Sequence, residues 1–281
     1  AEPHRRILQA GSAAVLGILL LFLTLRLHSG FQLVMLDVGQ GDGIYLRTAA
    51  GTTILIDGGS TSVTKVGTYR ILPFLKSEGV GRLDYIVVTH TDEDHISGIK
   101  ELLETASEPG GLRIGTLLLS GRSMEEEKGQ RLMENARESG VTVQKIEKGA
   151  VLRDGLTELT CLHPDGTKAY ADVNEASVVL ALRYQEFSVM LTGDLEETGE
   201  REILEREQKH GGKEWPPYGF AVLKAGHHGS RTSGSEAWLE AVKPRLTLIS
   251  CGRDNSYGHP HREALERLDA AGSKILQTTE C

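Results

Sequence analysis

The sequence is poor in cysteine, in aromatic residues and in positive charge. Its three cysteines, Cys161, Cys251 and Cys281, are too few and too scattered for a disulfide framework or a zinc knuckle. No tandem repeat or low-complexity linker divides the chain. Lysine and arginine number 31 against 39 acidic residues, which gives a formal net charge of −8. The surface field therefore does not favour nucleic acid, and an anionic substrate would need a local positive centre.

The first thirty residues differ from the rest of the chain. Residues 7–25 carry no formal charge and, as a helix, would be about as long as the hydrocarbon core of a bilayer is thick. We predict a membrane-spanning helix with its flanks over 1–30, with a secretory signal peptide or a buried core helix as the alternatives. The missing initiator methionine suggests a fragment of a longer protein. Arg5 and Arg6 precede the span and Arg26 follows it, so the positive-inside bias places the globular part outside the cytoplasm.

From residue 31 onward, short apolar runs with glycine turns alternate with helical patterns. Strands are expected at 31–38, 43–48, 52–59, 83–89, 114–120 and 141–146, and again at 156–163, 177–184, 187–194, 220–226, 245–251 and 274–278. Helices are expected at 66–78, bent or interrupted at Pro73, and at 96–104, 124–138, 195–209, 234–242 and 261–271. Two β-rich halves, each covered by helices, predict an α/β (α+β) domain over 31–281 with an αββα sandwich and a site on loops along one edge.

The loop at 89–98, THTDEDHISG, concentrates imidazoles and carboxylates at the end of an apolar strand. His90, Asp92, Asp94 and His95 would repel one another or have shifted pKa values unless a cation neutralised the cluster. A polar turn in which Asp94 caps a following helix is the alternative. Two histidines flanking two aspartates exceed what a surface turn requires, so the loop predicts a site for one or two divalent cations.

Two further groups of candidate ligands resemble this loop, because each follows an apolar strand. Asp194 lies in VMLTGDLEE, before a helix that it could instead cap. His227 and His228 lie in AVLKAGHHGS, where adjacent histidines at a strand tip suggest metal ligands, although core or surface histidines are the alternative. The loop at 89–98, Asp194 and the His227–His228 pair together indicate a metal site more specifically than any one of them does.

This combination resembles the metallo-β-lactamase superfamily, whose central motif is His-x-His-x-Asp-His, followed by a third-motif histidine, a bridging aspartate and a late histidine. The resemblance implies that His90, Asp94 and His95 are metal ligands, that Asp194 bridges, and that His227 is the late ligand, with His228 able to exchange for it. Asp92 stands where the second histidine is usual, and Asn174 stands near the third-motif position. His163 is the other candidate for that position, eleven residues earlier.

The departures indicate a narrower family. FQLVMLDVGQGD, THTDEDHISG, NEASVVLAL, LTGDLE, LKAGHHGS, NSYGHPH and QTTEC occur in the order found in the carboxy-terminal domain of the ComEC family of competence DNA-uptake channel proteins. The resemblance covers about residues 31–281. It implies a nuclease that degrades the non-transported strand of incoming DNA, at the extracytoplasmic face of the bacterial cell membrane. The implied partners are DNA, the membrane channel portion of the same or a longer chain, and competence DNA-receptor proteins.

The ligand set predicts the chemistry. Two divalent ions could generate a hydroxide for attack on phosphorus and neutralise the developing charge. Asp92 among the ligands makes the set rich in oxygen, which favours Mn²⁺ and leaves Zn²⁺ or Mg²⁺ as alternatives. Asp94 and His259 are the candidate catalytic residues, with His259 placed to donate to the phosphate or the leaving oxygen, or to complete a metal shell.

The remaining candidates are supporting residues. Lys224, His228 and Arg231 are candidates for substrate binding, with Arg253 as a further phosphate contact. Strand-tip residues could hold the ligand imidazoles, with a turn role as the alternative: Asp37, Gln40, Asp42 and Asp57. Two other functions stay open on sequence grounds, an extracytoplasmic phosphodiesterase of the phosphorylcholine esterase type and a non-catalytic metal-binding module of the uptake channel.

Overall fold

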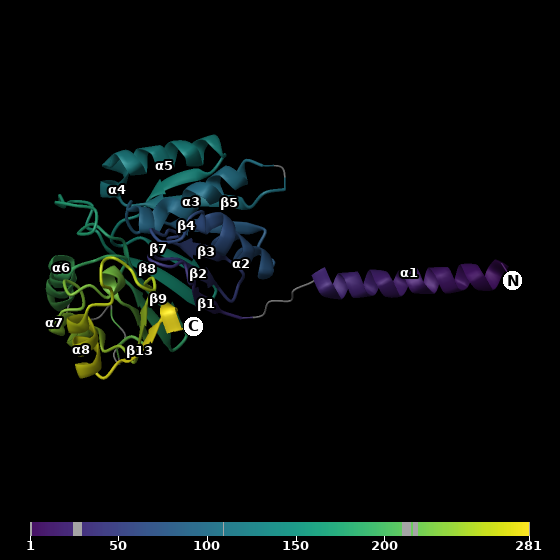
Figure 1. Cartoon of the computed structure of the whole chain (residues 1–281). Helices are drawn as coiled ribbons and strands as arrows, with labels where there is room; N and C mark the ends of the chain where they lie inside the picture. Colours follow the sequence, from purple (N-terminus) through teal and green to yellow (C-terminus); the bar gives the residue numbers. More distant parts are fainter. Residues whose placement is uncertain (1, 25–29, 109, 210–214, 216–218, 281) are drawn as a thin grey trace.

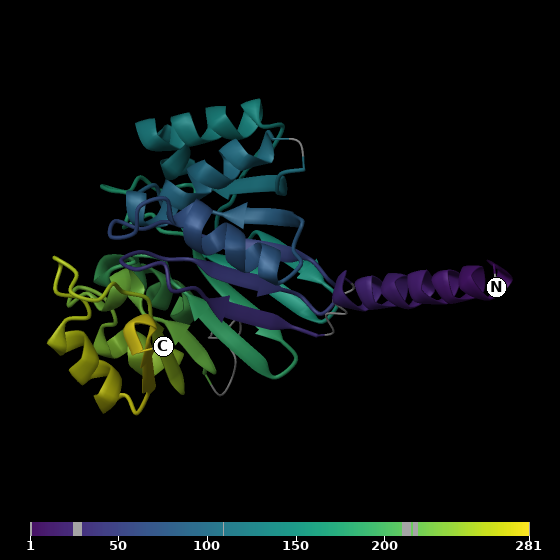
Figure 2. The same cartoon turned by 45° about the vertical axis from the view of Figure 1, so that its right-hand side comes forward.

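Two β-sheets stack face to face in the computed structural model, and helices cover the outer face of each sheet (Figure 1). The structure describes residues 2–24, 30–108, 110–209, 215 and 219–280, without the side chains of 2–4, 8 and 21–24. The turned view in Figure 2 shows the same layering and separates the two helical layers. The predicted αββα sandwich is therefore confirmed.

The first sheet contains six strands in sequential order. Strands β1 (Gln32–Met35), β2 (Ile44–Arg47) and β3 (Thr53–Ile56) are antiparallel neighbours, and β4 (Arg82–Val87), β5 (Arg113–Leu119) and β6 (Thr142–Lys145) continue the sheet in parallel with β3. Helices α3 (Glu93–Ala106), α4 (Gly121–Glu125) and α5 (Glu127–Glu138) lie in the layer outside this sheet, with the π-turn η1 (Gly67–Ile71) and α2 (Leu72–Ser77) (Figure 1). Parallel strands need such helical crossovers.

The second sheet contains seven strands in the order β13-β12-β11-β10-β9-β8-β7. Strands β7 (Val151–Asp154), β8 (Thr157–His163), β9 (Val179–Tyr184) and β10 (Phe187–Leu191) are antiparallel, whereas β11 (Val222–Lys224), β12 (Leu246–Ile249) and β13 (Lys274–Gln277) run parallel to β10. Helices α6 (Glu197–Lys209), α7 (Glu236–Val242) and α8 (Arg262–Ala270) cover this sheet, and two 3₁₀ turns complete it, η2 (Gly226–Gly229) and η3 (Thr278–Glu280).

The buried apolar side chains form three clusters that correspond to the three interfaces of the sandwich. Leu55 and Ile86 pack with Ile99 of α3 in the first cluster, and Ile54 and Leu180 meet between the sheets in the second. The third cluster joins the second sheet to its helices: Leu223, Trp238, Ile203 and Leu268. Burial on both faces explains why β2, β3 and β11 consist almost entirely of apolar residues.

Two of the predicted helices differ in detail from the structure. The helix expected over 124–138 is divided into α4 and α5, because Glu126 takes an extended backbone with φ −71° and ψ 144°. In the segment predicted over 66–78, the π-turn η1 leads directly into α2, and Pro73 lies in the first turn of α2, so the helix changes geometry at this proline. The hydrophobic pattern predicts which segments are helical, but it does not locate these boundaries.

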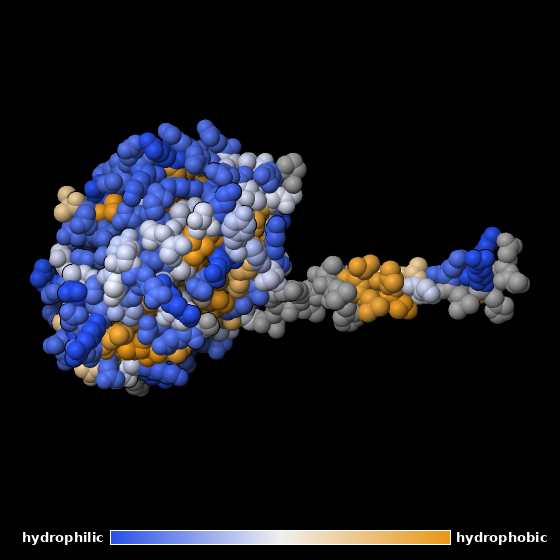
Figure 3. All heavy atoms as spheres, in the orientation of Figure 1, coloured by the Kyte–Doolittle hydropathy of each residue, from blue (hydrophilic) through white to orange (hydrophobic). Residues whose placement is uncertain are grey.

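The chain begins with helix α1 (Glu2–Thr24), which projects from the sandwich (Figure 1). Figure 3 shows apolar side chains along it, and six are more than half exposed: Ile7, Val15, Leu16, Ile18, Leu19 and Leu20. Within the described part of the chain, none of the helices combines the length and the apolar character that a membrane crossing needs. The predicted transmembrane helix over 7–25 is thus not supported, and residue 25 lies outside the described residues. The boundary at residues 30 and 31 stays a prediction.

Candidate metal centre

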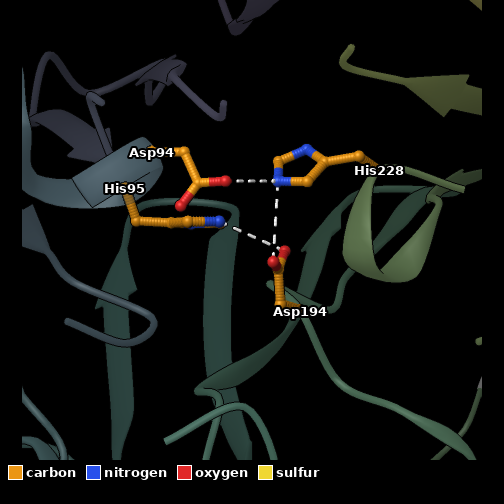
Figure 4. Close-up of side chains that lie close together, drawn as sticks. All are labelled: Asp94, His95, Asp194 and His228. Carbon is orange, nitrogen blue, oxygen red and sulfur yellow. Dashed lines mark ion pairs between the residues drawn. The ribbon is translucent and has the colours of Figure 1, made fainter. Parts of the chain in front are cut away.

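Four side chains from three separate segments meet at the edge where β4, β10 and β11 end (Figure 4). Asp94 and His95 lie in the first turn of α3, Asp194 follows β10, and His228 lies in η2 after β11. One ligand atom from each residue lies within 4.8 Å of the others. Asp92 starts α3 with an extended ψ of 152°, so the helix begins immediately after the strand loop and directs its first turn at the cluster.

Asp194 is the centre of this arrangement. Its Oδ1 lies 3.2 Å from His95 Nε2, and its Oδ2 lies 3.5 Å from His228 Nε2 and 3.8 Å from His90 Nε2. The Nε2 atom of His228 is also 3.4 Å from Asp94 Oδ2. The structure therefore brings together three points that are spread over 134 residues of the sequence, from Asp94 to His228.

The atoms that face the centre have no hydrogen-bond partners of their own. The Nε2 atoms of His90, His95 and His228 and the Oδ1 atom of Asp194 are all buried, and none makes a hydrogen bond within the described part of the chain. Buried polar atoms are normally paired, so four unpaired atoms around one point require an explanation. Imidazole nitrogens and carboxylate oxygens in this arrangement suit a divalent cation, and the residues present therefore fit the metal that the sequence predicts.

A second layer of hydrogen bonds fixes the orientation of the imidazoles. His95 Nδ1 lies 2.9 Å from Asp57 Oδ2, and Asp57 in turn accepts hydrogen bonds from the backbone N–H and the hydroxyl of Thr89 at 2.8 and 2.7 Å. His228 donates through Nδ1 to the carbonyl of Ser250 at 2.9 Å. Because Nδ1 is engaged in each ring, Nε2 is left to face the centre. The predicted supporting role of Asp57 agrees with this geometry.

Electrostatics show how strongly these groups depend on one another. Burial alone would raise the pKa of Asp194, but the nearby imidazoles of His228 and His95 hold it well below its usual range. Burial would lower the pKa of His228, but the carboxylates of Asp194 and Asp42 raise it to about 9. Burial and the neighbouring His95 lower the pKa of His90 to about 3. The carboxylates are thus ionised and attract positive charge, which a bound cation would supply in place of protons.

Lys224, a predicted substrate contact, is buried beneath the cluster. This lysine ends the buried strand β11, and its side chain is 1% exposed. Its ammonium donates to the carbonyl of Gly193 at 2.8 Å, contacts Asp42 and lies 3.6 Å from Asp194 Oδ1. Burial would lower the pKa of Lys224, but Asp42 and Asp194 raise it, so the lysine stays charged beneath the centre.

The two adjacent histidines have different positions. Both have left-handed backbone, with φ 45° at His227 and φ 53° at His228, a conformation that is costly for residues other than glycine and is often found at functional sites. His228 is buried in the four-residue cluster, although we predicted it to bind substrate. His227, the predicted late ligand, is 25% exposed, with Nε2 3.7 Å from Asp194 Oδ2 and Nδ1 2.9 Å from Glu196.

Asp92, in the position of the second histidine, lies beside the cluster at 3.8 Å from His90 Nε2. Its other oxygen accepts a hydrogen bond from Lys128 of α5 at 2.8 Å, and both side chains are exposed by more than 40%. The sequence did not single out Lys128, because it lies in a charged helix that resembles any solvated surface. Only the packing of α5 beside α3 brings it to the loop.

Asn174 and His163, the two candidates for the third-motif position, have different surroundings. Asn174 begins the segment that passes the site, in which Ser177 accepts from the N–H of Asp194 at 3.3 Å and Val178 bonds to Thr89. The Asn174 Oδ1 atom is buried and has no hydrogen-bond partner among the described residues. His163 instead donates through Nε2 to the carbonyl of Glu175 at 2.7 Å, and its ring lies edge-on to that of Tyr170.

The other predicted residues lie around the opening of the site or away from it. The ring of His259 is 5.5 Å from that of His227 and 6.1 Å from that of His228. Burial and the two histidines lower the pKa of His259 to about 4, so its imidazole is neutral at pH 7. Arg231 is 58% exposed. Gln40 accepts a hydrogen bond from the N–H of Gly252, and Arg253 donates to the carbonyl of Thr279. Asp42 contacts His228 and Lys224. Asp37 pairs with Arg70 at the surface.

Comparison with known proteins agrees with this geometry. Residues 36–253 match the metallo-β-lactamase superfamily. The chain is 30% identical over 274 residues to ComE operon protein 3 of Bacillus subtilis and 32% identical over 242 residues to competence protein ComA of Neisseria gonorrhoeae. These matches cover 93% and 86% of the chain but only 33% and 30% of the relatives, so the chain spans about a third of their length.

Among solved structures, the metallo-β-lactamase fold protein YhfI of Bacillus subtilis superposes with a TM-score of 0.56 at 10% identity, over 88% of this chain and 96% of that one. At this identity the likeness concerns the fold alone. The sequence matches, the fold and the histidine and aspartate cluster lead to the same assignment. The chain belongs to the metallo-β-lactamase superfamily, and within it to the ComEC family of competence proteins.

Proposed function

We propose that this domain is a metal-dependent phosphodiesterase that cuts DNA and degrades the non-transported strand during natural transformation. The observation that carries the proposal is the set of buried imidazole nitrogens without partners around Asp194, because such a set is suited to holding divalent cations. The choice of DNA rests on the relatives, which are a competence protein and a recombination protein by name. DNA as substrate and the partners remain proposals, because the chain spans about a third of these relatives.

The geometry suggests how two cations would be shared. Asp94, His95, Asp194 and His228 form the more complete site, since their ligand atoms lie within 4.8 Å of one another. His90, Asp92 and His227 would hold a second cation: Nε2 of His90 and of His227 lie 3.8 and 3.7 Å from Asp194 Oδ2, and Asp92 Oδ2 lies 3.8 Å from His90 Nε2. His228 therefore takes the ligand role that we first gave to His227, and His227 moves to the second site. With three carboxylates among its ligands, the set suits Mn²⁺, with Zn²⁺ or Mg²⁺ as alternatives.

When bound, such ions supply Lewis-acid stabilisation of the phosphoryl oxygens and an activated water. The chain's own residues hold and orient the participants. Asp57 and Ser250 fix the rings of His95 and His228, and Lys224 balances the charge of the buried carboxylates. His259 lies at the opening with a buried Nδ1 that has no partner among the described residues, placed to hydrogen-bond a phosphate or leaving oxygen. Arg231 is exposed beside it and can contact a further phosphate.

The test combines metal content with cleavage of end-labelled DNA. We expect the purified chain to bind divalent metal and, with Mn²⁺, to shorten labelled single-stranded or double-stranded DNA, and Asp94→Ala to abolish cleavage. Asp37→Ala is the matched control, because Asp37 is an exposed aspartate paired with Arg70 away from the cluster. Intact DNA together with hydrolysis of phosphorylcholine diesters would replace the nuclease by the esterase. Absence of metal and of any hydrolysis would leave only a non-catalytic module.

We also propose that the domain works at the extracytoplasmic face of the bacterial membrane, next to the channel portion of a longer protein and to DNA-receptor proteins. This part of the proposal rests on the competence relatives, of which the chain covers about a third. Protease treatment of intact cells should remove the domain if it lies outside the membrane. Protection until the cells are opened would contradict this location.

A further inference from the structure

One aromatic ring stands at the opening of the site, and nothing assigned so far uses it. Tyr257 is 52% exposed, and its ring stacks on that of His259, with centroids 5.7 Å apart and planes inclined by 19°. His259 in turn lies 5.5 Å from His227 and 6.1 Å from His228. The outer face of Tyr257 is thus connected to the metal centre through a single imidazole.

The loop that carries Tyr257 is held in place before any substrate arrives. The side chain of Asn255 donates to the carbonyls of Gly252 and His259 at 2.9 and 2.6 Å and accepts from the N–H of His259 at 3.0 Å. The N–H of His261 donates to Gly229 at 2.9 Å, which ties the loop to the segment bearing His227 and His228. A ring that is already positioned loses little conformational entropy when a ligand stacks on it.

We propose that Tyr257 stacks on an unpaired nucleobase next to the phosphodiester that is cut, which makes the site selective for single-stranded DNA. The inference rests on the proposed nuclease function. Every nucleobase has a π face, so stacking tolerates any sequence, but in a duplex those faces are covered by neighbouring pairs. The role also compensates for the net charge of −8, which gives the backbone phosphates little general attraction.

A quaternary ammonium group, as in phosphorylcholine, is the rival occupant of this ring. Such groups are recognised by cages of several aromatic rings, because each face contributes only part of the attraction. Among the described residues, His259 provides the one ring that packs against Tyr257. One open face backed by an imidazole matches a stacked base better than it matches a cage.

The test uses two single-stranded oligonucleotides of equal length, one with normal bases and one with abasic sites, which keep all the phosphates. We expect the wild-type chain to prefer the base-bearing strand by roughly 10-fold to 100-fold in kcat/KM, the range that one stacked base provides. Tyr257→Ala should lose this preference through a higher KM with little change in kcat. Tyr257→Phe and Tyr257→Trp should keep it, because the π face remains. Tyr69→Ala is the matched control, since Tyr69 is 65% exposed on η1.

A binding measurement separates this inference from the proposed function. Anisotropy of a fluorescein-labelled thymidine oligonucleotide in excess chelator reports stacking without cleavage, in wild type and in Tyr257→Ala. If DNA is bound in a Tyr257-dependent way but never cut, the nuclease function fails and the stacking role stands. If DNA is cut but Tyr257→Ala treats both strands as wild type does, the stacking role fails alone. An equal loss on normal and abasic strands, or a loss in Tyr257→Phe as large as in Tyr257→Ala, would also overturn it.

Discussion

Two lysine–aspartate pairs contact the same cluster of ligands, one from inside the protein and one from its surface. Lys224 and Asp42 are 1% and 2% exposed, whereas Lys128 and Asp92 are 46% and 41% exposed. The two pairs have the same chemical groups, but they differ in their exposure to water. In the interior each charge has lost its hydration and depends on its partner, whereas at the surface water can replace either one. The comparison indicates that the fold depends on the buried Lys224–Asp42 pair, whereas it tolerates changes in the exposed Lys128–Asp92 pair.

The largest expected effect is on the buried pair. Lys224→Met should lower the free energy of unfolding by about 3–5 kcal/mol, because Asp42 is left as an uncompensated buried charge beside Asp194. Urea denaturation followed by circular dichroism measures this loss. A loss no larger than that caused by Lys128→Met would show that the two pairs do not differ as proposed.

The next effect distinguishes loss of activity from loss of stability. Asp94→Ala should reduce kcat on DNA by about 1,000-fold, because the carboxylate 3.4 Å from His228 Nε2 is proposed to hold a cation that stabilises the transition state. Its melting temperature should fall less than that of Lys224→Met, because the buried Lys224–Asp42 pair is left intact. Asp37→Ala should retain both activity and stability. Retention of more than a tenth of the wild-type kcat in Asp94→Ala would remove Asp94 from the catalytic set.

A smaller effect concerns the second layer. Asp57→Asn keeps the size of the side chain but removes the carboxylate that orients His95, 2.9 Å from its Nδ1. Metal affinity should fall by roughly 10-fold to 100-fold, as found when such outer partners are removed. Competition with a chromophoric chelator measures it, with Asp84→Asn as the control on another strand. Unchanged affinity would mean that Thr89 and the packing alone orient the ring.

The smallest effect belongs to the exposed pair. Lys128→Met should change the free energy of unfolding by less than about 1 kcal/mol, and the difference should shrink as salt is added. Parallel urea titrations at low and high ionic strength measure both quantities. A loss comparable to that of Lys224→Met, or one insensitive to salt, would mean that Asp92 and Lys128 are shielded from water.

Much of the fold is predictable because its signals are local. Apolar runs at 83–89, 187–194 and 220–226 predict strands, and the polar residues that follow them predict a site at strand ends, which is where the structure puts it. The sequence predicts His90, Asp92, Asp94 and His95 as ligands because all four occupy one loop. The boundary between α4 and α5 was missed because it depends on the backbone of a single residue, Glu126.

The side-chain positions that the sequence did not predict share a different cause. Nothing in GHHG tells which histidine turns inward, because that choice depends on two left-handed residues and on the carbonyl of Ser250, which lies on another strand end. Lys224 resembles a phosphate-binding lysine until its strand is seen to be buried. Lys128 had no signal at all, since its contact with Asp92 spans 36 residues between two elements.

The sequence by itself determined the types of ligand, the order of the strands and helices, and the family, because residue chemistry and hydrophobic periodicity are written in short segments. The tertiary structure decided which of the two adjacent histidines is buried beside Asp194, which lysine is buried and which aromatic ring lies at the opening. These outcomes depend on burial and on contacts between distant segments, and both arise only when the two sheets pack and their parallel strand ends meet at one edge.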